Sequence, residues 1–159
     1  MVKEEIQEFS KEEQKLAKKT IGDLLKLLSV DDKFEISFSE KTIDLSLDTE
    51  DKGIMIGYHG EILDSLQLVF SLCVSKKIGR FVHVSMDVGD YKKNRMDFLK
   101  NITLQTKERV VLEKIELPLP NLKPWERRFV HMLLQGDEEV VSESVGEGQL
   151  RTLVIKPKV

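Results

Sequence analysis

The spacing of apolar residues changes several times along the first 114 residues, and the order of these changes limits the folds that the chain can adopt. Helical spacing covers about Ser10 to Leu28. The segments "KFEISFSE" and "TIDLSLD" then alternate apolar and polar residues, and the short connection between them predicts an antiparallel hairpin. A glycine-rich turn, a second helical run, the strand-like segment "FVHVSMDV" and a long helix follow. This order predicts an α+β fold with a three-stranded sheet.

The ends and faces of the predicted helices carry matching signals. Ser10 and Glu13 have the spacing of a capping box, in which each side chain accepts a hydrogen bond from the other residue's backbone. The long helix is predicted from about Tyr91 to Lys114. The second helical run places its apolar residues at helical spacing, namely Ile62, Leu63, Leu66, Val69, Phe70, Cys73 and Val74.

The segment "IELPLPNLKP" holds three of the four prolines and predicts a boundary between two domains. We expect a first domain over residues 1–114 and a second over residues 115–159. In the second, "PWERRFVHMLLQG" is predicted as a helix with proline in its first turn and Gly136 at its end. "EEVVSESV" and "RTLVIKP" are predicted as strands, which gives a small α/β domain.

Composition excludes several classes of protein. With 40% hydrophobic residues the chain has enough apolar matter for packed cores, which excludes a wholly disordered chain. Its one cysteine, Cys73, excludes an internal disulfide and fits a reducing compartment. The apolar stretch "LQLVFSLCV" is too short to span a bilayer, and the charged N-terminus lacks the apolar core of a signal peptide. We therefore expect a cytoplasmic protein without membrane insertion.

Charge is distributed unevenly although the net charge is only −3. Residues 1–65 hold 9 Lys and Arg against 16 Asp and Glu, whereas residues 66–135 hold 13 against 7. A basic middle between acidic flanks is what a polyanion-binding face in an acidic protein would look like. An accident of charge placement explains the same numbers equally well.

Two glycines stand three residues apart at the start of the second helical run, in the stretch Gly57-Tyr58-His59-Gly60. Glycine has no Cβ, so a Gly-x-x-Gly turn at a helix N-terminus lets a phosphodiester backbone approach the first helical amides, which carry partial positive charge. The loop of a KH domain clamps single-stranded nucleic acid in this way. Other helix-entry turns also contain this pattern, but here it follows a hairpin and precedes a helix and a third strand.

Four segments in order resemble the Jag family of bacterial RNA-binding proteins, also called SpoIIIJ-associated, KhpB or EloR proteins. They are "IMIGYHGEILDSLQLVFSLCVSKK", "FVHVSMDVGDYKKNR", "PWERRFVHMLL" and "VGEGQLRTLVIKP". The resemblance covers roughly residues 10 to 157. It implies a type II KH domain, then an R-3-H domain named after its Arg-x-x-x-His motif, with single-stranded RNA or DNA as ligand. It also implies that the sheet and the residues beside the loop form a groove for bases.

Carried onto this chain, the resemblance implies a set of nucleic-acid-binding residues. They are Gly57, Tyr58, His59 and Gly60 in the first domain and Arg127, Arg128, His131 and Arg151 in the second. Arg127 and His131 are four apart on a helix and so project from one face. A guanidinium pairs with phosphate, and an imidazole stacks on a base or hydrogen-bonds to it. The alternative is that His131 is a structural histidine and the arginines form a solvated face.

The loop departs from the family pattern because KH loops usually carry a lysine or arginine between the glycines. Neither Tyr58 nor His59 is a fixed cation at neutral pH, since the reference pKa of histidine is about 6.5. We expect weaker and more pH-sensitive affinity through this loop, with Tyr58 available to stack on a base.

Lysines recur every seven residues along the long helix, at Lys93, Lys100, Lys107 and Lys114. Seven residues are nearly two helical turns, so the four ammonium groups are expected to form one stripe. Together with Lys76, Lys77, Lys92 and Arg95, the stripe would extend a cationic track from the loop towards Arg127. The favoured alternative is a helix that simply keeps its outer face solvated.

Enzymatic functions find little support. Cys73 lies on the apolar face of its helix, and His59, His83 and His131 have no metal-ligand spacing, so we expect no catalysis, no metal and no cofactor. Two hypotheses remain. The first is a single-stranded RNA-binding protein in bacterial post-transcriptional regulation linked to cell-envelope growth or sporulation, as the resemblance implies. The second is an adaptor that pairs with another KH protein or with itself and has little RNA affinity.

Overall fold

The computed structural model describes residues 8–30, 33–40 and 42–158, which form two compact units. The first unit ends at Lys92 and the second begins at Lys93. Each unit has its own three-stranded sheet and its own cluster of buried apolar side chains. Each is therefore held together by its own core.

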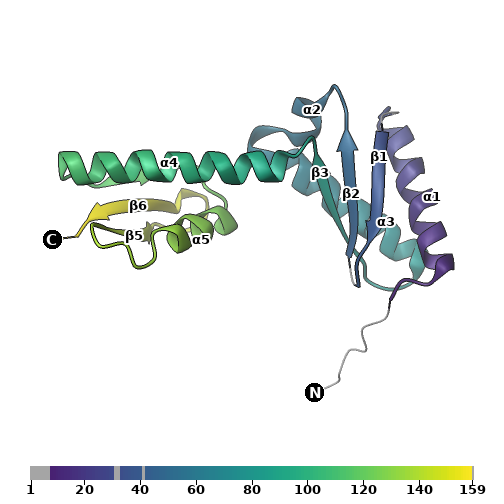
Figure 1. The fold of residues 1–159 in the computed structure, drawn as a ribbon. Coiled ribbons are helices and arrows are strands. Elements are labelled where there is room, and N and C mark those ends of the chain that lie inside the picture. The colour runs from purple at the N-terminus through teal and green to yellow at the C-terminus, as the bar shows by residue number, and fades with distance from the viewer. Residues whose placement is uncertain (1–7, 31–32, 41, 159) are drawn as a thin grey trace, which may run out of the picture. The chain divides into compact units, whose positions relative to one another are not determined.

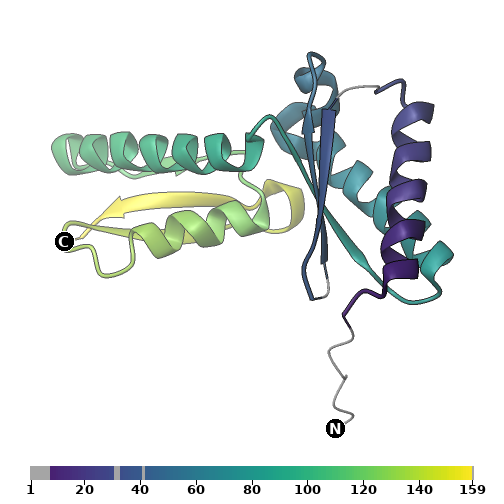
Figure 2. The same ribbon diagram turned by 45° about the vertical axis from the view of Figure 1, so that its right-hand side comes forward.

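The first unit follows the order helix, strand, strand, helix, helix, strand. Its elements are α1 (Lys11–Leu27), β1 (Lys33–Phe38), β2 (Thr42–Asp48), α2 (Lys52–Ile56), a 3-10 turn (Tyr58–Gly60), α3 (Glu61–Ile78) and β3 (His83–Val88). β2 is central, antiparallel to β1 and parallel to β3. The helices α1 and α3 cover one face of this sheet (Figures 1 and 2). This is the order of a type II KH fold, as the resemblance implied.

The capping box predicted at the start of α1 is confirmed. The backbone N–H of Glu13 donates to Oγ of Ser10 at 3.2 Å, and the backbone N–H of Ser10 donates to Oε2 of Glu13 at 2.8 Å. The predicted hairpin is also confirmed, with Ile36 opposite Leu45 in the antiparallel register. Alternate residues of β2 and β3 are buried beneath the helices, so the alternation in the sequence identified the core-facing side of the sheet.

The element α2 lies where the sequence predicted only a glycine-rich turn. Its five residues are too few for an apolar repeat to be recognisable, and Met55 is the one that is buried. The backbone N–H of Gly57 donates to the carbonyl of Gly53 and ends the helix. The loop between α2 and α3 therefore connects the two helices through only four residues, 57–60.

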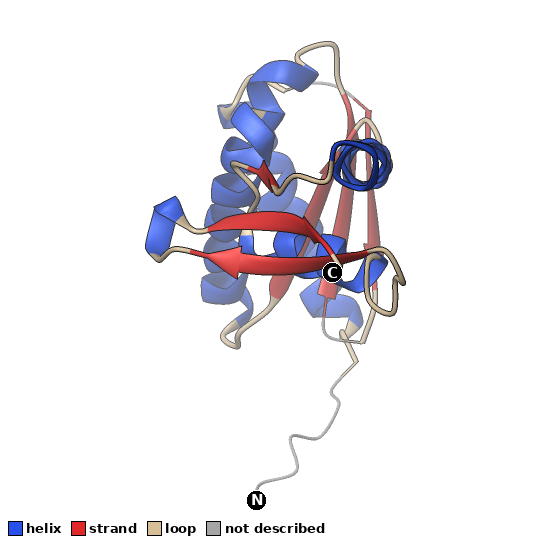
Figure 3. Cartoon of the chain, turned by 90° about the vertical axis from the view of Figure 1, so that its left-hand side faces the viewer, coloured by secondary structure: helices blue, strands red, loops and turns tan. Residues whose placement is uncertain are grey.

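The second unit contains two helices and a second antiparallel sheet (Figures 1 and 3). Its elements are α4 (Tyr91–Glu113), β4 (Leu117–Leu119), α5 (Pro124–Leu133), β5 (Val140–Val145), a 3-10 turn (Gly148–Leu150) and β6 (Thr152–Pro157). The first two residues of α4 still belong to the first unit. The strand order is β4-β6-β5. Leu99 and Val110 of α4 pack in the same core as Val130 of α5 and Ile155 of β6.

The division between the units differs from the one that the prolines predicted. The sequence placed it between residues 114 and 115, whereas the structure divides at Lys92 and Lys93 because the apolar side of α4 packs in the second core. The proline-rich segment is not a plain connection either, since it contains β4. Pro118 is accommodated because β4 is an edge strand, where a missing N–H leaves no ladder hydrogen bond unmade.

Candidate nucleic-acid interface

The Gly-x-x-Gly loop connects α2 to α3 in an unusual backbone conformation. Gly57 has φ of 69°, His59 of 50° and Gly60 of 80°, all in the left-handed region. The rings of Tyr58 and His59 stack with centroids 4.1 Å apart and planes inclined by 8°. Tyr58 is 63% exposed, so one flat aromatic surface lies at the mouth of α3.

Both glycines are required by contacts inside the first unit. A Cβ at Gly57 would lie 2.5 Å from Cγ1 of Ile62, and a Cβ at Gly60 would lie 2.9 Å from the ring of Tyr91. Together with the positive φ angles, these contacts exclude larger residues without any ligand being present. The sequence pattern attributed the glycines to a nucleic-acid backbone and did not reveal this internal reason.

Replacing Gly60 by alanine should destabilise the first unit by more than the same change at Gly79. Gly60 and Gly79 have similar φ angles, 80° and 88°. A Cβ at Gly60 would meet Tyr91, whereas a Cβ at Gly79 would meet nothing within 4 Å. Gly79→Ala therefore carries backbone strain of about 1 kcal/mol, and Gly60→Ala carries that strain plus the steric contact. Urea denaturation of the two variants checks this. Equal losses of unfolding free energy would show that Tyr91 moves aside freely.

Carboxylates surround the loop and its sheet. The first turn of α3 carries Glu61 and Asp64, which stabilise the helix N-terminus but repel phosphate. The sheet face that α1 and α3 leave uncovered carries polar side chains in registered rows, namely Glu35, Ser37, Asp44, Ser46, His83, Ser85 and Asp87. Lys33 lies in the same row as Glu35, and Nζ of Lys92 donates to Oγ of Ser85, so carboxylates outnumber ammonium groups on this face but do not exclude them. The excess of negative charge disfavours the groove for bases that the family resemblance suggested on the sheet.

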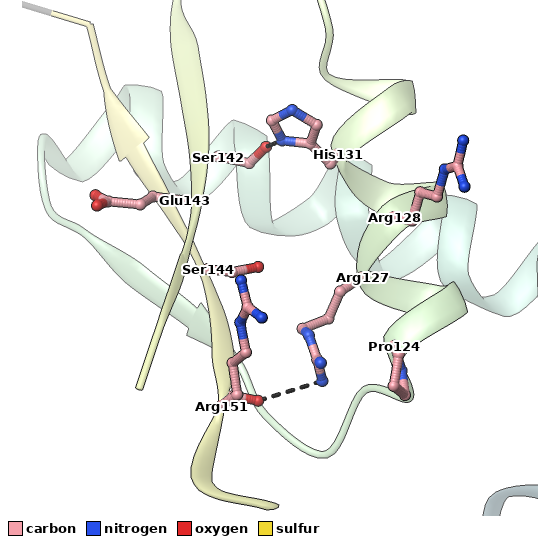
Figure 4. A pocket seen from close by; sticks show the side chains of 8 residues that line it. All are labelled: Pro124, Arg127, Arg128, His131, Ser142, Glu143, Ser144 and Arg151. Atoms are coloured by element: carbon pink, nitrogen blue, oxygen red, sulfur yellow. Dashed lines mark hydrogen bonds between the residues drawn. The ribbon is translucent and has the colours of Figure 1, made fainter. Parts of the chain in front are cut away.

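A pocket of about 480 Å³ lies in the second unit between α5 and the end of its sheet (Figure 4). It brings together all four residues that the resemblance assigned to this domain. The lining consists of Pro124, Arg127, Arg128, His131, Ser142, Glu143, Ser144 and Arg151. Residues 20 or more apart in the chain thus meet at one cationic site.

The local structure explains why these side chains meet. Arg127 and His131 are one turn apart on α5, while Glu126 and Val130, on another side of the helix, are buried. On β5, Ser142 and Ser144 alternate with Glu143 and so face the same side of the strand. The helix periodicity made the first pair predictable. The serines were missed, because no short-range signal pairs a strand residue with a helix that precedes it.

Hydrogen bonds fix the two residues of the Arg-x-x-x-His motif. Nδ1 of His131 lies 2.7 Å from Oγ of Ser142, which is itself 7% exposed. Nη1 of Arg127 donates to the carbonyl of Leu122 at 2.7 Å and to that of Arg151 at 3.4 Å. Arg127 therefore also ties the entry of α5 to the start of β6. The solvated-face alternative does not describe Arg127, whereas the contact of His131 with Ser142 is what the alternative of a structural histidine predicts.

The pocket has an excess of positive charge. Arg128 and Arg151 are exposed, and within the described residues neither has a recorded ion pair. The one carboxylate in the lining, that of Glu143, lies 2.9 Å from Nζ of Lys156 and points away from the arginines in Figure 4. Three guanidinium groups, an imidazole and two hydroxyl groups thus line a hollow whose one carboxylate is paired with Lys156, a lysine that also lies 3.5 Å from Glu116.

A buried ion pair positions the start of α5. Nε of Arg95 donates to Oε1 of Glu126 at 2.7 Å, and the two side chains are 9% and 0% exposed. Oε2 of Glu126 also accepts a hydrogen bond from the backbone of Lys123, the residue before α5. Arg95 was expected in the cationic track. This expectation was wrong, because its guanidinium is buried in an ion pair with Glu126 inside the second unit.

The lysine stripe on α4 is interrupted. Lys107 lies 2.5 Å from Asp137 and 3.4 Å from Glu139. The hydrogen bond between Lys107 and Asp137 raises the pKa of the lysine and lowers the pKa of the carboxyl. Lys114 falls beyond the last residue of α4 and has φ of 58°. A continuous row of free cations along the helix is therefore excluded, whereas Lys93 is exposed.

Other kinds of site were sought in the described part of the chain. No group of three or more His, Cys, Asp or Glu side chains is placed to hold a metal ion there. No helix among those residues has the length and apolar character needed to cross a bilayer.

Comparison with known proteins agrees with this geometry. Residues 15–86 match the family described as the KhpA/KhpB KH domain, and residues 97–157 match the R-3-H domain family. The chain therefore combines a KH domain with an R-3-H domain. In this order, the two domains match the KhpB family, which is the Jag family that the sequence resembles.

Curated relatives named RNA-binding protein KhpB are similar over most of this chain. The protein from Clostridium symbiosum is 34% identical over 131 residues, which are 82% of this chain and 59% of the relative. The protein from Bacillus subtilis is 27% identical over 122 residues, which are 76% of this chain and 59% of the relative. For Streptococcus pneumoniae strain D39 the identity is 28%, over 74% of this chain and 36% of the relative. The chain thus spans at most about three fifths of the length of these relatives.

Proposed function

We propose that this chain binds single-stranded RNA and that the pocket between α5, β5 and the start of β6 is its main phosphate site. The observation that carries the proposal is the convergence of Arg127, Arg128 and Arg151 on one hollow whose carboxylate, that of Glu143, is paired with Lys156. Guanidinium groups pair with phosphate oxygens through parallel hydrogen bonds. The relatives named RNA-binding protein KhpB support the same ligand.

The Gly-x-x-Gly loop contributes a second, weaker contact in this proposal. Its exposed aromatic surface at Tyr58 suits stacking on a base, while Glu61 and Asp64 next to it disfavour a strong phosphate site. Two weak contacts carried by one chain act at high effective concentration and so bind more tightly than either alone. From the family resemblance alone, we extend the proposal to post-transcriptional regulation linked to cell-envelope growth or sporulation.

The proposal is tested by fluorescence anisotropy with random-sequence single-stranded RNA at several salt concentrations. Affinity should fall as salt rises, with a slope of about 0.7 per phosphate contacted, because binding releases counterions. The double variant Tyr58→Asp/His59→Asp should lose several-fold in affinity. Aspartate tolerates the left-handed conformation of position 59, so the loop remains foldable.

The matched control is Lys11→Gln/Lys15→Gln, which lowers the net charge by the same two units at exposed positions of α1. Its affinity should stay near that of the wild type. An equal loss in both double variants would show that the loop acts only through overall charge. A folded wild type that binds no RNA at tens of micromolar protein, about the non-specific range, would remove the proposal.

A protein-pairing function is the second candidate, favoured by unpartnered apolar side chains on α3. Ile62, Leu68, Val69 and Leu72 are each between 45% and 61% exposed. Such a surface is characteristic of contact with another protein. Absence of RNA binding in the anisotropy experiment would favour pairing with a second KH protein, or with a second copy, as the principal function.

A further inference from the structure

Trp125, the only tryptophan of the chain, is the second residue of α5 and is 48% exposed. It directly follows Pro124, which lines the arginine pocket. A tryptophan has a large apolar area whose exposure to water is costly. An exposed tryptophan next to a cationic pocket therefore suits a ligand that has both an apolar surface and an anionic group.

The helix geometry places Trp125 beside Arg128, one of the residues that line the pocket. Trp125 precedes Arg128 by three residues and Met132 follows Arg128 by four, so the three side chains are neighbours on one side of α5. Arg128 lines the pocket, and Met132 is 60% exposed. An arginine is thus bracketed by two exposed apolar side chains, one of them aromatic.

We propose that Trp125 is a stacking platform for a base of the single strand whose phosphates occupy the arginine pocket, with Met132 extending the apolar rim. The inference rests on the proposed RNA-binding function and adds the group that contacts the bases. Interleaved cationic and aromatic side chains recur in single-strand sites, where charge follows the backbone and rings stack on bases. Every base has a flat π-face, so the contact adds affinity without requiring a particular sequence.

The intrinsic fluorescence of Trp125 gives a direct measurement, because no other tryptophan contributes to the signal. The full chain is titrated with single-stranded oligoadenylate of about 10 nucleotides, within the usual site size, and with an abasic strand that has the same number of phosphates. Binding of both strands is followed in parallel by anisotropy of an end label. Oligoadenylate should quench the indole emission at the concentrations at which the anisotropy rises, whereas the abasic strand should bind more weakly and quench little.

Variants separate stacking from charge. Trp125→Ala should weaken oligoadenylate binding by at least about fivefold, the lower end for one base on one aromatic side chain, and leave abasic binding unchanged. Trp125→Phe keeps a ring and should retain most of the affinity. The matched control is Leu112→Ala, which removes an 83% exposed apolar side chain of the second unit from a separate hollow that contains no arginine. Its affinity should equal that of the wild type.

The outcomes distinguish this inference from the function on which it rests. Salt-dependent oligoadenylate binding without quenching, with Trp125→Ala equal to the wild type, would overturn the stacking role and leave RNA binding intact. Failure of the wild type to bind either strand would overturn both. A loss of abasic binding in Trp125→Ala would show that the tryptophan acts by shaping the pocket, which also contradicts stacking.

Discussion

Replacing Arg128 and Arg151 together by alanine should weaken RNA binding by at least about a hundredfold while leaving the thermal midpoint of the second unit unchanged. Each guanidinium is exposed and lines the pocket, so its removal costs a charge-assisted contact worth about 1.5–3 kcal/mol but no buried partner. Loss of two phosphate contacts should also reduce the salt slope by about 1.4. Anisotropy across a salt series, with a thermal melt of each variant, measures both effects.

The control for this pair is Lys100→Ala/Arg109→Ala on α4, which removes the same charge from exposed residues that face Asp97 and Glu113. Its affinity for RNA should fall only by the small amount expected from removing two positive charges outside the binding pocket. Similar affinities in the two double variants would contradict a localised phosphate site. Arg127 is a less suitable probe, since its bonds to the carbonyls of Leu122 and Arg151 make its replacement a structural change as well.

Replacing Glu126 by alanine should lower the unfolding free energy of the second unit by about 3–5 kcal/mol. The change leaves the guanidinium of Arg95 buried without its carboxylate and removes the acceptor for the backbone N–H of Lys123. Such a loss is a large part of the 5–15 kcal/mol that stabilises an ordinary domain. Urea denaturation followed by the emission of Trp125 reports on this unit directly, because the tryptophan is the preceding residue of α5.

Two further variants show whether this loss comes from the buried ion pair. The double variant Arg95→Met/Glu126→Leu replaces both charges by apolar side chains and should recover much of the lost stability. Glu113→Ala breaks the exposed pair with Arg109 and should cost no more than about 0.5 kcal/mol. A loss below about 1 kcal/mol for Glu126→Ala would mean that water reaches Arg95 and that the pair is not sealed in the core.

Much of the fold could be predicted because its signals are local. The reciprocal bonds of Ser10 and Glu13 depend on residues three apart, and the strands of the first sheet show their buried side as simple alternation. The helical spacing of Arg127 and His131 indicated one face of one helix. The family resemblance added Arg128 and Arg151, which no periodicity distinguishes from other surface arginines.

The remainder could not be predicted because it depends on contacts between distant residues. The partner of Arg95 stands 31 positions away, and that of Lys107 stands 30 away. Nothing in the neighbouring sequence of either residue indicates that its charge is paired with a carboxylate. The division between the units was misplaced for the same reason: proline is a local signal, whereas the assignment of α4 depends on which core receives Leu99 and Val110.

Under the proposed function, the uncovered sheet face of the first unit affects how a single strand approaches the protein. Carboxylates of Glu35, Asp44 and Asp87 project there in registered rows, and their field extends about 8 Å at physiological ionic strength. A strand that approaches this face should be repelled there and so should not remain in an unproductive encounter.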